Sequence, residues 1–245
     1  MKEYRMMIGE GGVFGLGGPI TQCGVMYIGW HEGDSPITEE RGRVLLSCDE
    51  ATYRAYGKQI KSYSVLHIRG EKDDNTFLAE EFLAVNAAPT EAEQAFLSQA
   101  ALPVTFTDPQ FGEFTQNKRL DFFEGKLRHG GRNISITADE REDIETLRWI
   151  CEDLDAFFER AARCAAEELL DLGNDWSFDA WEGEEADFVP MTAEDFAARI
   201  SLTSISLLEE ESFSLWFSDD DIFWGHAIEV EGSKAEGFTG ASMQG

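Results

Sequence analysis

Basic residues are scarce in this sequence, which has 20 Lys and Arg against 48 Asp and Glu and a formal net charge of -28 at pH 7. So strong a negative charge repels the phosphates of nucleic acids and the headgroups of anionic membranes. We therefore expect no nucleic acid and no membrane as partner, and the charge favours cations and basic proteins instead. Acidity that serves only to keep the protein in solution is the alternative interpretation.

Long apolar runs are also missing. No stretch approaches the ~20 apolar residues that cross a bilayer, and the first residues, MKEYRMMIGEGGVFGLGG, lack the apolar core of a signal peptide. The four cysteines, Cys23, Cys48, Cys151 and Cys164, form no CxxC pair, so we expect reduced and mostly buried thiols. These features together predict a cytoplasmic protein.

Metal and cofactor motifs are absent from the sequence. His31, His67 and His129 are isolated, and their spacing does not predict a zinc site. The glycines between Gly9 and Gly18 lack the Lys-Ser or Lys-Thr of a phosphate-binding loop and a strand-to-helix context. We interpret this segment as a flexible loop or glycine-rich turn, and we expect no cofactor.

What the sequence does contain is typical of a globular protein, with 42% hydrophobic and 12% aromatic residues. The first 100 residues hold 15 acidic and 9 basic residues, a net charge of -6, whereas the remaining 33 acidic and 11 basic residues give -22. This asymmetry and the proline at Leu102-Pro103, which interrupts regular secondary structure, predict two units, residues 1–102 and 103–245.

The first unit is predicted to be small and rich in strands. Apolar runs with β-branched and aromatic residues predict strands at 25–30, 43–48, 63–69 and 76–85. Asp49 is expected to cap a short helix that runs to about Gly57. Thr90 and Glu93 have the spacing of a capping box, which predicts a helix towards Ala101.

The second unit shows a clearer order of elements. Segments 111–115, 119–128 and 132–137 are typical of an antiparallel meander. Thr137 and Glu140 suggest a capping box before one long apolar stripe over 139–172, which predicts a helix ended by Gly173 and Asn174. A straight helix of that span would be ~50 Å long, which favours a kink or a break.

A short helix and further strands complete the second unit. Thr192 and Asp195 are expected to start the helix, and strands are predicted at 201–208, 212–217, 223–231 and 238–243. The fold class is therefore α+β, an antiparallel sheet packed by one long helix and short helices, preceded by the small strand-rich α+β unit.

Two acidic turns and a tryptophan are the predicted binding residues. The turns do not have the alternating ligands of a calcium loop, and we expect them to form one negative patch on an edge of the sheet. The predicted set is Glu209, Glu210, Glu211, Asp219, Asp220, Asp221 and Trp224.

His226 is the single catalytic candidate. It follows Trp224 in a predicted strand, close to three aspartates that would raise its pKa or fix one tautomer. A structural histidine that is hydrogen-bonded within a sheet is the favoured interpretation.

Several motifs in the second unit resemble a known family. They are Phe111-Gly-Glu-Phe114, the helix end Leu-Leu-Asp-Leu-Gly-Asn-Asp-Trp176, Met191-Thr-Ala-Glu-Asp-Phe196 and Asp221-Ile-Phe-Trp-Gly-His-Ala-Ile-Glu-Val230. Over about residues 104–245 the chain resembles the uncharacterised bacterial family called domain of unknown function 2262. The resemblance implies a fold unit and no reaction. Small acidic bacterial proteins of this kind are often compared with immunity proteins of toxin systems, which is an analogy.

Three functional hypotheses follow. The leading one is a non-enzymatic acidic protein-binding module, specifically an immunity-type inhibitor of a basic cognate toxin. The alternative is an enzyme or small-ligand binder with His226 and nearby carboxylates at a cleft between the two units. The third is a housekeeping scaffold whose acidity means only solubility. The sequence does not specify an oligomeric state.

Overall fold

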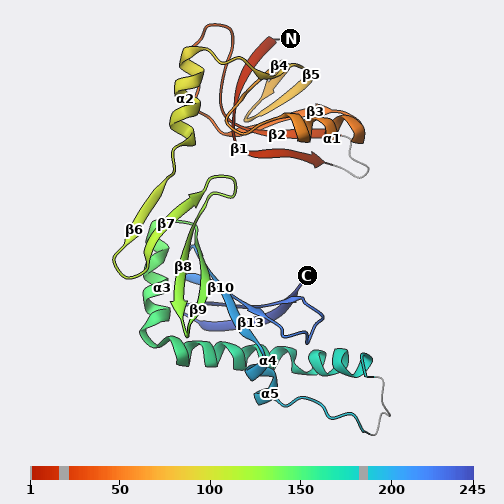
Figure 1. The fold of residues 1–245 in the computed structure, drawn as a ribbon, viewed down its shortest axis with the longest axis vertical. Coiled ribbons are helices and arrows are strands. Elements are labelled where there is room, and N and C mark those ends of the chain that lie inside the picture. Colours follow the sequence, from red (N-terminus) through yellow and green to blue (C-terminus); the bar gives the residue numbers. More distant parts are fainter. Residues whose placement is uncertain (1, 17–21, 182–186) are drawn as a thin grey trace. The chain divides into compact units, whose positions relative to one another are not determined.

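The computed structural model describes residues 2–16, 22–181 and 187–245. The chain divides into two compact units, Met1–Pro103 and Val104–Gly245, and each has its own hydrophobic core. The fold class is α+β, as predicted, with one sheet in each unit (Figure 1).

Unit 1 is a closed barrel of five strands in the order β1-β2-β3-β5-β4. Its strands are β1 (Lys2–Leu16), β2 (Gln22–His31), β3 (Gly42–Ser47), β4 (Val65–Asp73) and β5 (Thr76–Ala87), and its helices are α1 (Glu50–Gln59) and α2 (Glu91–Ala101). All neighbours are antiparallel except β3 and β5.

The glycine-rich segment near the N-terminus is part of a strand. Our prediction of a flexible loop is wrong for residues 2–16, because β1 runs through Gly9, Gly11, Gly12 and Gly15. At Gly9 a Cβ atom would lie 2.7 Å from Cγ2 of Ile28, so the missing side chain lets β1 and β2 approach within the barrel. Residues 17 and 18 of this cluster lie outside the described residues.

The two helices of unit 1 begin at the predicted residues. The Asp49 carboxylate accepts a hydrogen bond from the Thr52 amide at 2.8 Å and caps α1. Thr90 and Glu93 form the predicted capping box of α2. Both signals are local hydrogen bonds over three residues, which is why the sequence predicts them well.

Unit 2 contains an eight-stranded sheet in the order β13-β12-β11-β10-β9-β8-β7-β6. The strands are β6 (Thr105–Asp108), β7 (Gly112–Asn117), β8 (Phe122–His129), β9 (Arg132–Ala138), β10 (Ser201–Leu208), β11 (Ser212–Ser218), β12 (Ala227–Ser233) and β13 (Gly237–Gln244). All neighbours are antiparallel except β9 and β10.

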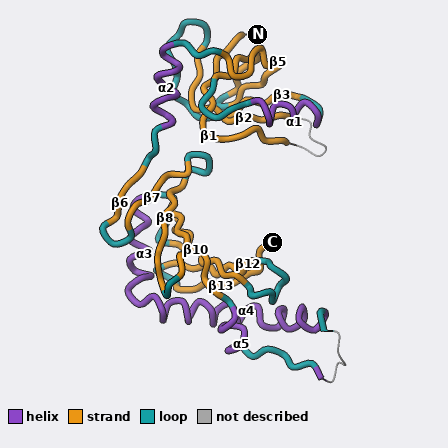
Figure 2. Tube along the Cα trace, viewed as in Figure 1, coloured by secondary structure: helices purple, strands orange, loops and turns teal. Residues whose placement is uncertain are grey.

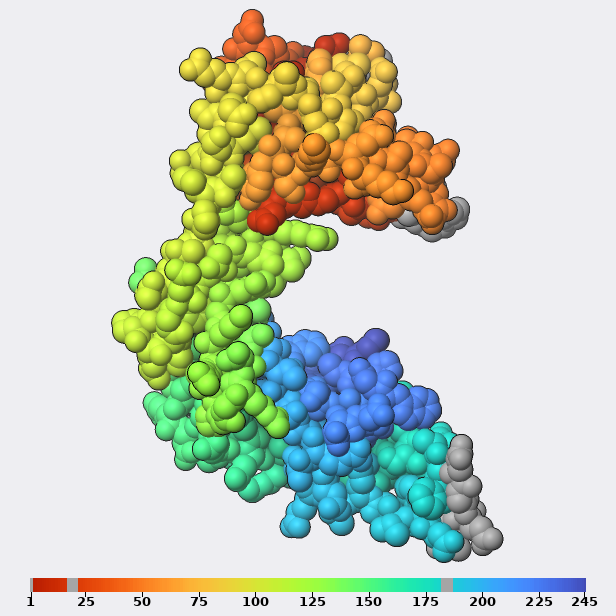
Figure 3. All heavy atoms as spheres, viewed as in Figure 1, coloured from red at the N-terminus to blue at the C-terminus, as the bar shows by residue number. Residues whose placement is uncertain are grey.

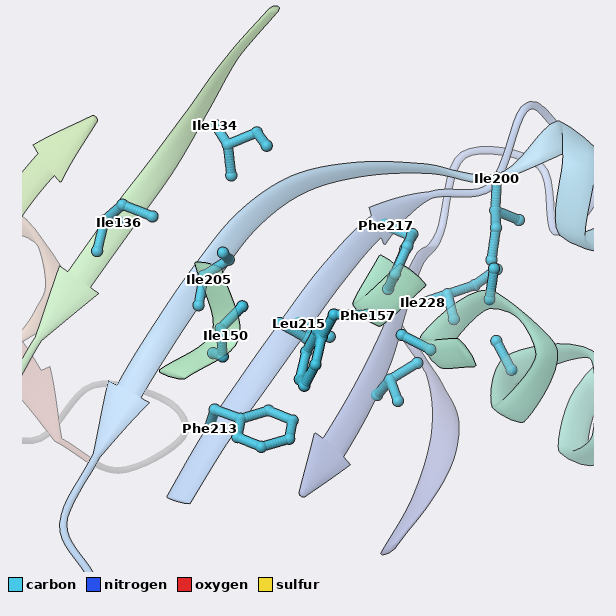
Figure 4. Close-up of a cluster of buried hydrophobic side chains, with 14 of the residues drawn as sticks. Ile134, Ile136, Ile150, Phe157, Ile200, Ile205, Phe213, Leu215, Phe217 and Ile228 are labelled. Carbon is cyan, nitrogen blue, oxygen red and sulfur yellow. The ribbon is translucent and has the colours of Figure 1, made fainter. Parts of the chain in front are cut away.

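The helices of unit 2 lie along one face of its sheet (Figure 2). They are η1 (Arg141–Asp143), α3 (Ile144–Ile150), η2 (Cys151–Asp153), α4 (Leu154–Asp179) and α5 (Ala193–Arg199). The core lies between them and the sheet (Figure 4). It includes Ile134, Ile136, Ile205, Phe213, Leu215 and Phe217 from the strands and Ile150 and Phe157 from the helical side. No described helix is long and apolar enough to cross a membrane.

The long helical stripe contains a break, as its length predicted without placing it, and the stripe ends later than predicted. The 3-10 turn η2 separates α3 from α4, and α4 continues through Gly173 and Asn174 to Asp179. A Cβ atom on Gly173 would lie 3.0 Å from Ile222 and 3.2 Å from Phe196. Gly173 therefore allows close packing inside the helix and does not end it.

Two further predictions at the ends of elements are wrong. Thr137 belongs to β9, and the capping box before the helices is formed by Glu140 and Asp143 instead. The strand predicted at 223–231 begins only at Ala227, because the preceding residues form turns. α5 begins with the predicted capping box of Thr192 and Asp195.

The cysteines are all free. Cys23 is buried, and the other three are half-buried. Burial raises the pKa of the Cys23 thiol to about 12, so this thiol is protonated at neutral pH.

Candidate functional site

The segment between β11 and β12, residues 219–226, has an unusual backbone, and we call it the 219–226 loop. Asp220, Asp221 and Trp224 have positive φ angles of 46°, 65° and 57°. A bulky residue such as tryptophan rarely adopts this conformation, which costs about 1–3 kcal/mol and persists only where other contacts hold it. Backbone strain of this kind occurs preferentially at functional sites.

The Asp219 side chain holds the loop in this conformation. Its side chain is almost fully buried, with 4% of the residue exposed. Its carboxylate accepts hydrogen bonds from three backbone amides, those of Asp221 at 3.2 Å, Phe223 at 2.7 Å and Gly225 at 3.2 Å. Its oxygens are thus engaged within the loop, and its role is to anchor the residues that follow.

Aromatic rings attach the same loop to helix α4. The Trp176 ring lies 4.7 Å from that of Trp224, 5.8 Å from Phe223 and 5.7 Å from His226, measured between ring centroids. Phe223 is fully buried, whereas Trp224 is 60% exposed. The loop therefore buries one aromatic residue as an anchor and presents the next one to solvent.

Two carboxylates precede the exposed tryptophan in the loop. Asp220 is paired with Arg199 of α5, whose Nε donates to Asp220 Oδ2 at 3.0 Å and whose Nη2 donates to the Asp220 carbonyl at 2.6 Å. Asp221 is exposed, and its carboxylate forms no ion pair with any described residue. We call the set Trp176, Asp220, Asp221, Trp224 and His226 the tryptophan corner.

The approach to α5 is fixed by another side chain of the family motifs. The Asn174 amide donates to the Met191 carbonyl at 3.1 Å, and its oxygen accepts from the Met191 amide at 2.7 Å. Asn174 thereby joins α4 to the segment that leads into α5. The helix that carries Arg199 is thus positioned relative to the tryptophan corner.

His226 lies at the end of the loop and outside any strand. The ring is half-buried and contacts Trp176, and a Cβ atom on Gly245 would lie 1.6 Å from its Nδ1 atom, so the chain passes directly against the ring. Among the described residues, no carboxylate forms a hydrogen bond or an ion pair with this imidazole. The ring is therefore packed against its neighbours beside a turn, and not within the sheet where the favoured structural interpretation placed it.

The other acidic turn lies far from this corner. Glu209, Glu210 and Glu211 precede β11, whereas Asp219 follows it, so seven strand residues, about 24 Å, separate the two turns. The prediction that the two turns form one patch is wrong. Glu211 pairs with Lys234 at 2.8 Å.

Glu209 lines a hollow near the opposite end of the sheet from the tryptophan corner. The hollow measures about 540 Å³ and is lined by Gln116, Asp121, Phe123, Asp139, Glu140, Arg141, Glu142 and Glu209. The predicted roles of Glu209 and Glu210 in binding stay predictions.

Unit 1 contains a buried ionic cluster that the sequence did not predict. The Glu93 side chain has no exposed surface and accepts hydrogen bonds from Arg5 at 2.6 Å, His31 at 2.9 Å and the Thr90 amide at 2.6 Å. Burial alone would raise the pKa of Glu93, but these donors outweigh it and lower the pKa to about 2. Within the described ranges, no group of three His, Cys, Asp or Glu side chains could hold a metal ion.

Unit 2 is thus an α+β domain with an eight-stranded sheet, helices on one face and the tryptophan corner beside α4. Residues 108–243 match the model of a family described as an uncharacterized protein conserved in bacteria, DUF2262, and the chain belongs to this family. The motifs that form the corner, around Trp176 and from Asp221 to Val230, lie within the matched residues. No curated protein and no solved structure matches the chain.

Proposed function

We propose that this protein is a non-enzymatic protein-binding module that binds a basic partner through unit 2, specifically an immunity-type inhibitor of a basic toxin. The net charge supports the sign of the partner, because residues 101–245 contain 33 acidic and 11 basic residues. Such a surface steers a cationic partner and raises the association rate at low salt.

The observation that carries the proposal is the exposed Trp224 in its anchored loop. Tryptophan is enriched among the few residues that dominate binding energy at protein interfaces. Here it is held at positive φ and supported by Trp176, so its position is fixed before a partner arrives. A prepositioned side chain loses less conformational entropy on binding than a free one.

The neighbouring carboxylate makes the corner suitable for a cationic partner. Asp221, which forms an ion pair with none of the described residues, lies in the same loop as Trp224, and its charge favours a lysine or arginine at the interface. An arginine that stacks on the open face of a tryptophan gains a further cation–π attraction of about 0.5–2 kcal/mol.

The alternative function, an enzyme or small-ligand binder that uses His226, stays a prediction. The contacts of the imidazole are ring packing and the passing chain end, and neither favours catalysis. The cytoplasmic location also stays a prediction.

Affinity capture from the native host tests the proposal. We expect the full chain to capture a protein with a net positive charge at low salt and to capture less of it as salt rises, because screening weakens the attraction. Trp224→Ala should lower the affinity for that protein about 30-fold, the effect of losing roughly 2 kcal/mol at an interface hot spot.

Trp181→Ala is the matched control, because Trp181 is another exposed tryptophan, 45% exposed, just beyond α4. It should leave the affinity unchanged. The proposal fails if no basic protein is captured at either salt concentration, or if both tryptophan variants bind as well as the wild type.

A further inference from the structure

Strand β13 forms an open edge of the unit 2 sheet. It pairs with β12 on one side, and no described strand pairs with its other side. Its eight residues, GFTGASMQ, include no charged residue and no proline. Charged residues and prolines are what usually prevent an exposed edge strand from pairing with another chain. The opposite edge, β6, has four residues and is flanked by Pro103 and Pro109. Figure 3 shows the end of the chain, in dark blue, at the surface of unit 2.

The register identifies which backbone groups of β13 are open. The Lys234 amide donates to the Glu211 carbonyl at 3.0 Å, just beyond the paired residues Ser212 and Ser233. Ser212 and Ser233 are therefore a non-hydrogen-bonded pair, and residues 228, 230 and 232 of β12 direct their amides and carbonyls towards β11. Residues 227, 229 and 231 direct theirs towards β13.

The same alternation in the direction of the backbone groups continues into β13, because the pairing of residues 229–231 with β13 has no register shift. Glu229 is opposite Ser242 and Glu231 is opposite Gly240, so Ser242 and Gly240 use their backbone groups to bind β12. The amides and carbonyls of the intervening Ala241, and of Met243, must then point away from the sheet. They form an unused ladder on the open side.

We propose that β13 accepts an extended strand of the basic partner, which joins the sheet along this ladder. The inference rests on the proposed function for the sign of the partner's charge, whereas the mode of binding comes from the edge itself. Strand addition of this kind takes its affinity from main-chain hydrogen bonds and its specificity from alternate side chains.

The side chains on the two faces of β12 and β13 indicate which residue types should alternate along the added strand. On the face away from the helices, the small Gly240 and Ser242 separate the edge from Glu231 and Glu229 of β12. Glu231 is exposed and forms no ion pair with any described residue. A long basic side chain on the added strand can lie across the small residues towards these carboxylates.

The other face of the edge is apolar. Phe238, Ala241 and Met243 pack against the hydrophobic core below the sheet, and the Phe238 ring lies 5.0 Å from that of Phe157 of α4. The occupant is therefore a segment in which apolar and basic residues alternate. Apolar side chains face the helices, and lysine or arginine faces the carboxylates.

A second copy of the chain fits this edge less well. Each copy carries a net charge of -28, so pairing two β13 strands brings two strongly negative sheets together. The edge is also continuous with the tryptophan corner, because Gly245 follows β13 and lies against the His226 ring. A strand along β13 would thus end beside the surface proposed to bind the partner.

Fluorescence anisotropy with labelled octapeptides tests the proposal on the full chain. The probe alternates valine and lysine four times, and its control is a peptide of the same composition with four valines followed by four lysines. The alternating peptide should bind at least tenfold more tightly than the control. On binding, the Ala241 and Met243 amides should become protected from hydrogen exchange, whereas the Ser242 amide is protected in the free protein as well.

Ala241→Pro is the blocking variant, because proline is tolerated on an edge strand where its missing N–H faces solvent. It should lower the affinity for the alternating peptide at least tenfold and leave the thermal unfolding temperature nearly unchanged. An alternating peptide with every second amide N-methylated on the bonding side should also fail to bind, whatever the stability of the variant.

Equal binding of the two isomeric peptides, or full binding to the N-methylated peptide, would overturn strand addition while leaving the electrostatic proposal intact. If neither peptide binds but the wild type captures a basic protein, strand addition is likewise overturned and the electrostatic proposal stands. A concentration-dependent dimer in sedimentation that disappears in Ala241→Pro would overturn the assignment of the edge to a basic partner.

Discussion

Replacing Glu93 by alanine is expected to lower the free energy of unfolding of unit 1 by about 3–5 kcal/mol, the cost of leaving buried ionic partners uncompensated. The Glu93 carboxylate has no exposed surface and joins three segments, β1 through Arg5, the end of β2 through His31, and the start of its own helix through Thr90. Its loss leaves Arg5 and His31 without their shared acceptor and removes half of the capping box.

Denaturant unfolding at pH 7 measures this effect. Glu91→Ala is the matched control, because Glu91 lies in the same first helical turn and is exposed. It should change the free energy of unfolding by no more than about 0.5 kcal/mol. If the two variants unfold at the same denaturant concentration, the buried cluster does not stabilise the barrel as we infer.

The pH dependence of the wild type gives a second view of the same carboxylate. The pKa of Glu93 is lowered from 4.5 to about 2 in the folded protein. A lowered pKa contributes stability that is present above the unfolded value and lost as the pH falls towards the folded value. The contribution is about 3 kcal/mol at neutral pH, and it should disappear between pH 5 and about pH 2. In Glu93→Gln this part of the acid sensitivity of unit 1 should be missing.

The sequence predicts well what is decided by neighbouring residues. The capping residues Asp49, Thr90 and Thr192 each satisfy an amide three residues away, so their helices begin at the expected residues. The apolar stripe of the long helix and the strands at 201–208 and 212–217 follow the same local logic. Their periodicity alone identifies the face that must be buried.

What the sequence did not predict depends on residues far apart in the chain. Glycine is a residue type that often ends a helix, but close packing of Gly173 against Ile222 and Phe196 keeps it inside α4. His31 looks isolated, yet it meets Glu93, 62 residues away. The glycine-rich start of the sequence resembles a loop because the reason for one of its glycines, the close approach of Gly9 to Ile28 of β2, lies in another strand.

The candidate site was predicted in part for the same reason. Trp224 and the carboxylates at 220 and 221 were identified from composition, whereas their support by Trp176 and Arg199 arises only when α4 and α5 pack beside the loop. Asp219 was grouped with its neighbours as a surface acid. The fold instead buries it, because the amides of a tight turn converge on one carboxylate.

Replacing Asp219 by alanine is expected to remove binding of the basic partner although this side chain is not exposed. The change leaves three backbone amides without their acceptor, and buried unsatisfied donors cost about 1–3 kcal/mol each when they cannot reach water. We expect unit 2 to lose about 3 kcal/mol of stability. Trp224, Asp220 and Asp221 should then leave their positive φ conformations, since the strain in their backbones is no longer offset.

Unfolding by urea and affinity for the captured basic protein are the two measurements. Asp219→Asn should fall between wild type and alanine, because the side-chain amide has one oxygen acceptor in place of two and cannot receive all three backbone amides as the carboxylate does. Asp220→Ala is the control for the urea measurement alone, since its exposed ion pair with Arg199 contributes about 1 kcal/mol or less to stability. If Asp219→Ala, at a temperature where unit 2 remains folded, binds the partner as tightly as the wild type, the ordered loop is not the binding surface. The tryptophan corner would then have to be abandoned as the functional site.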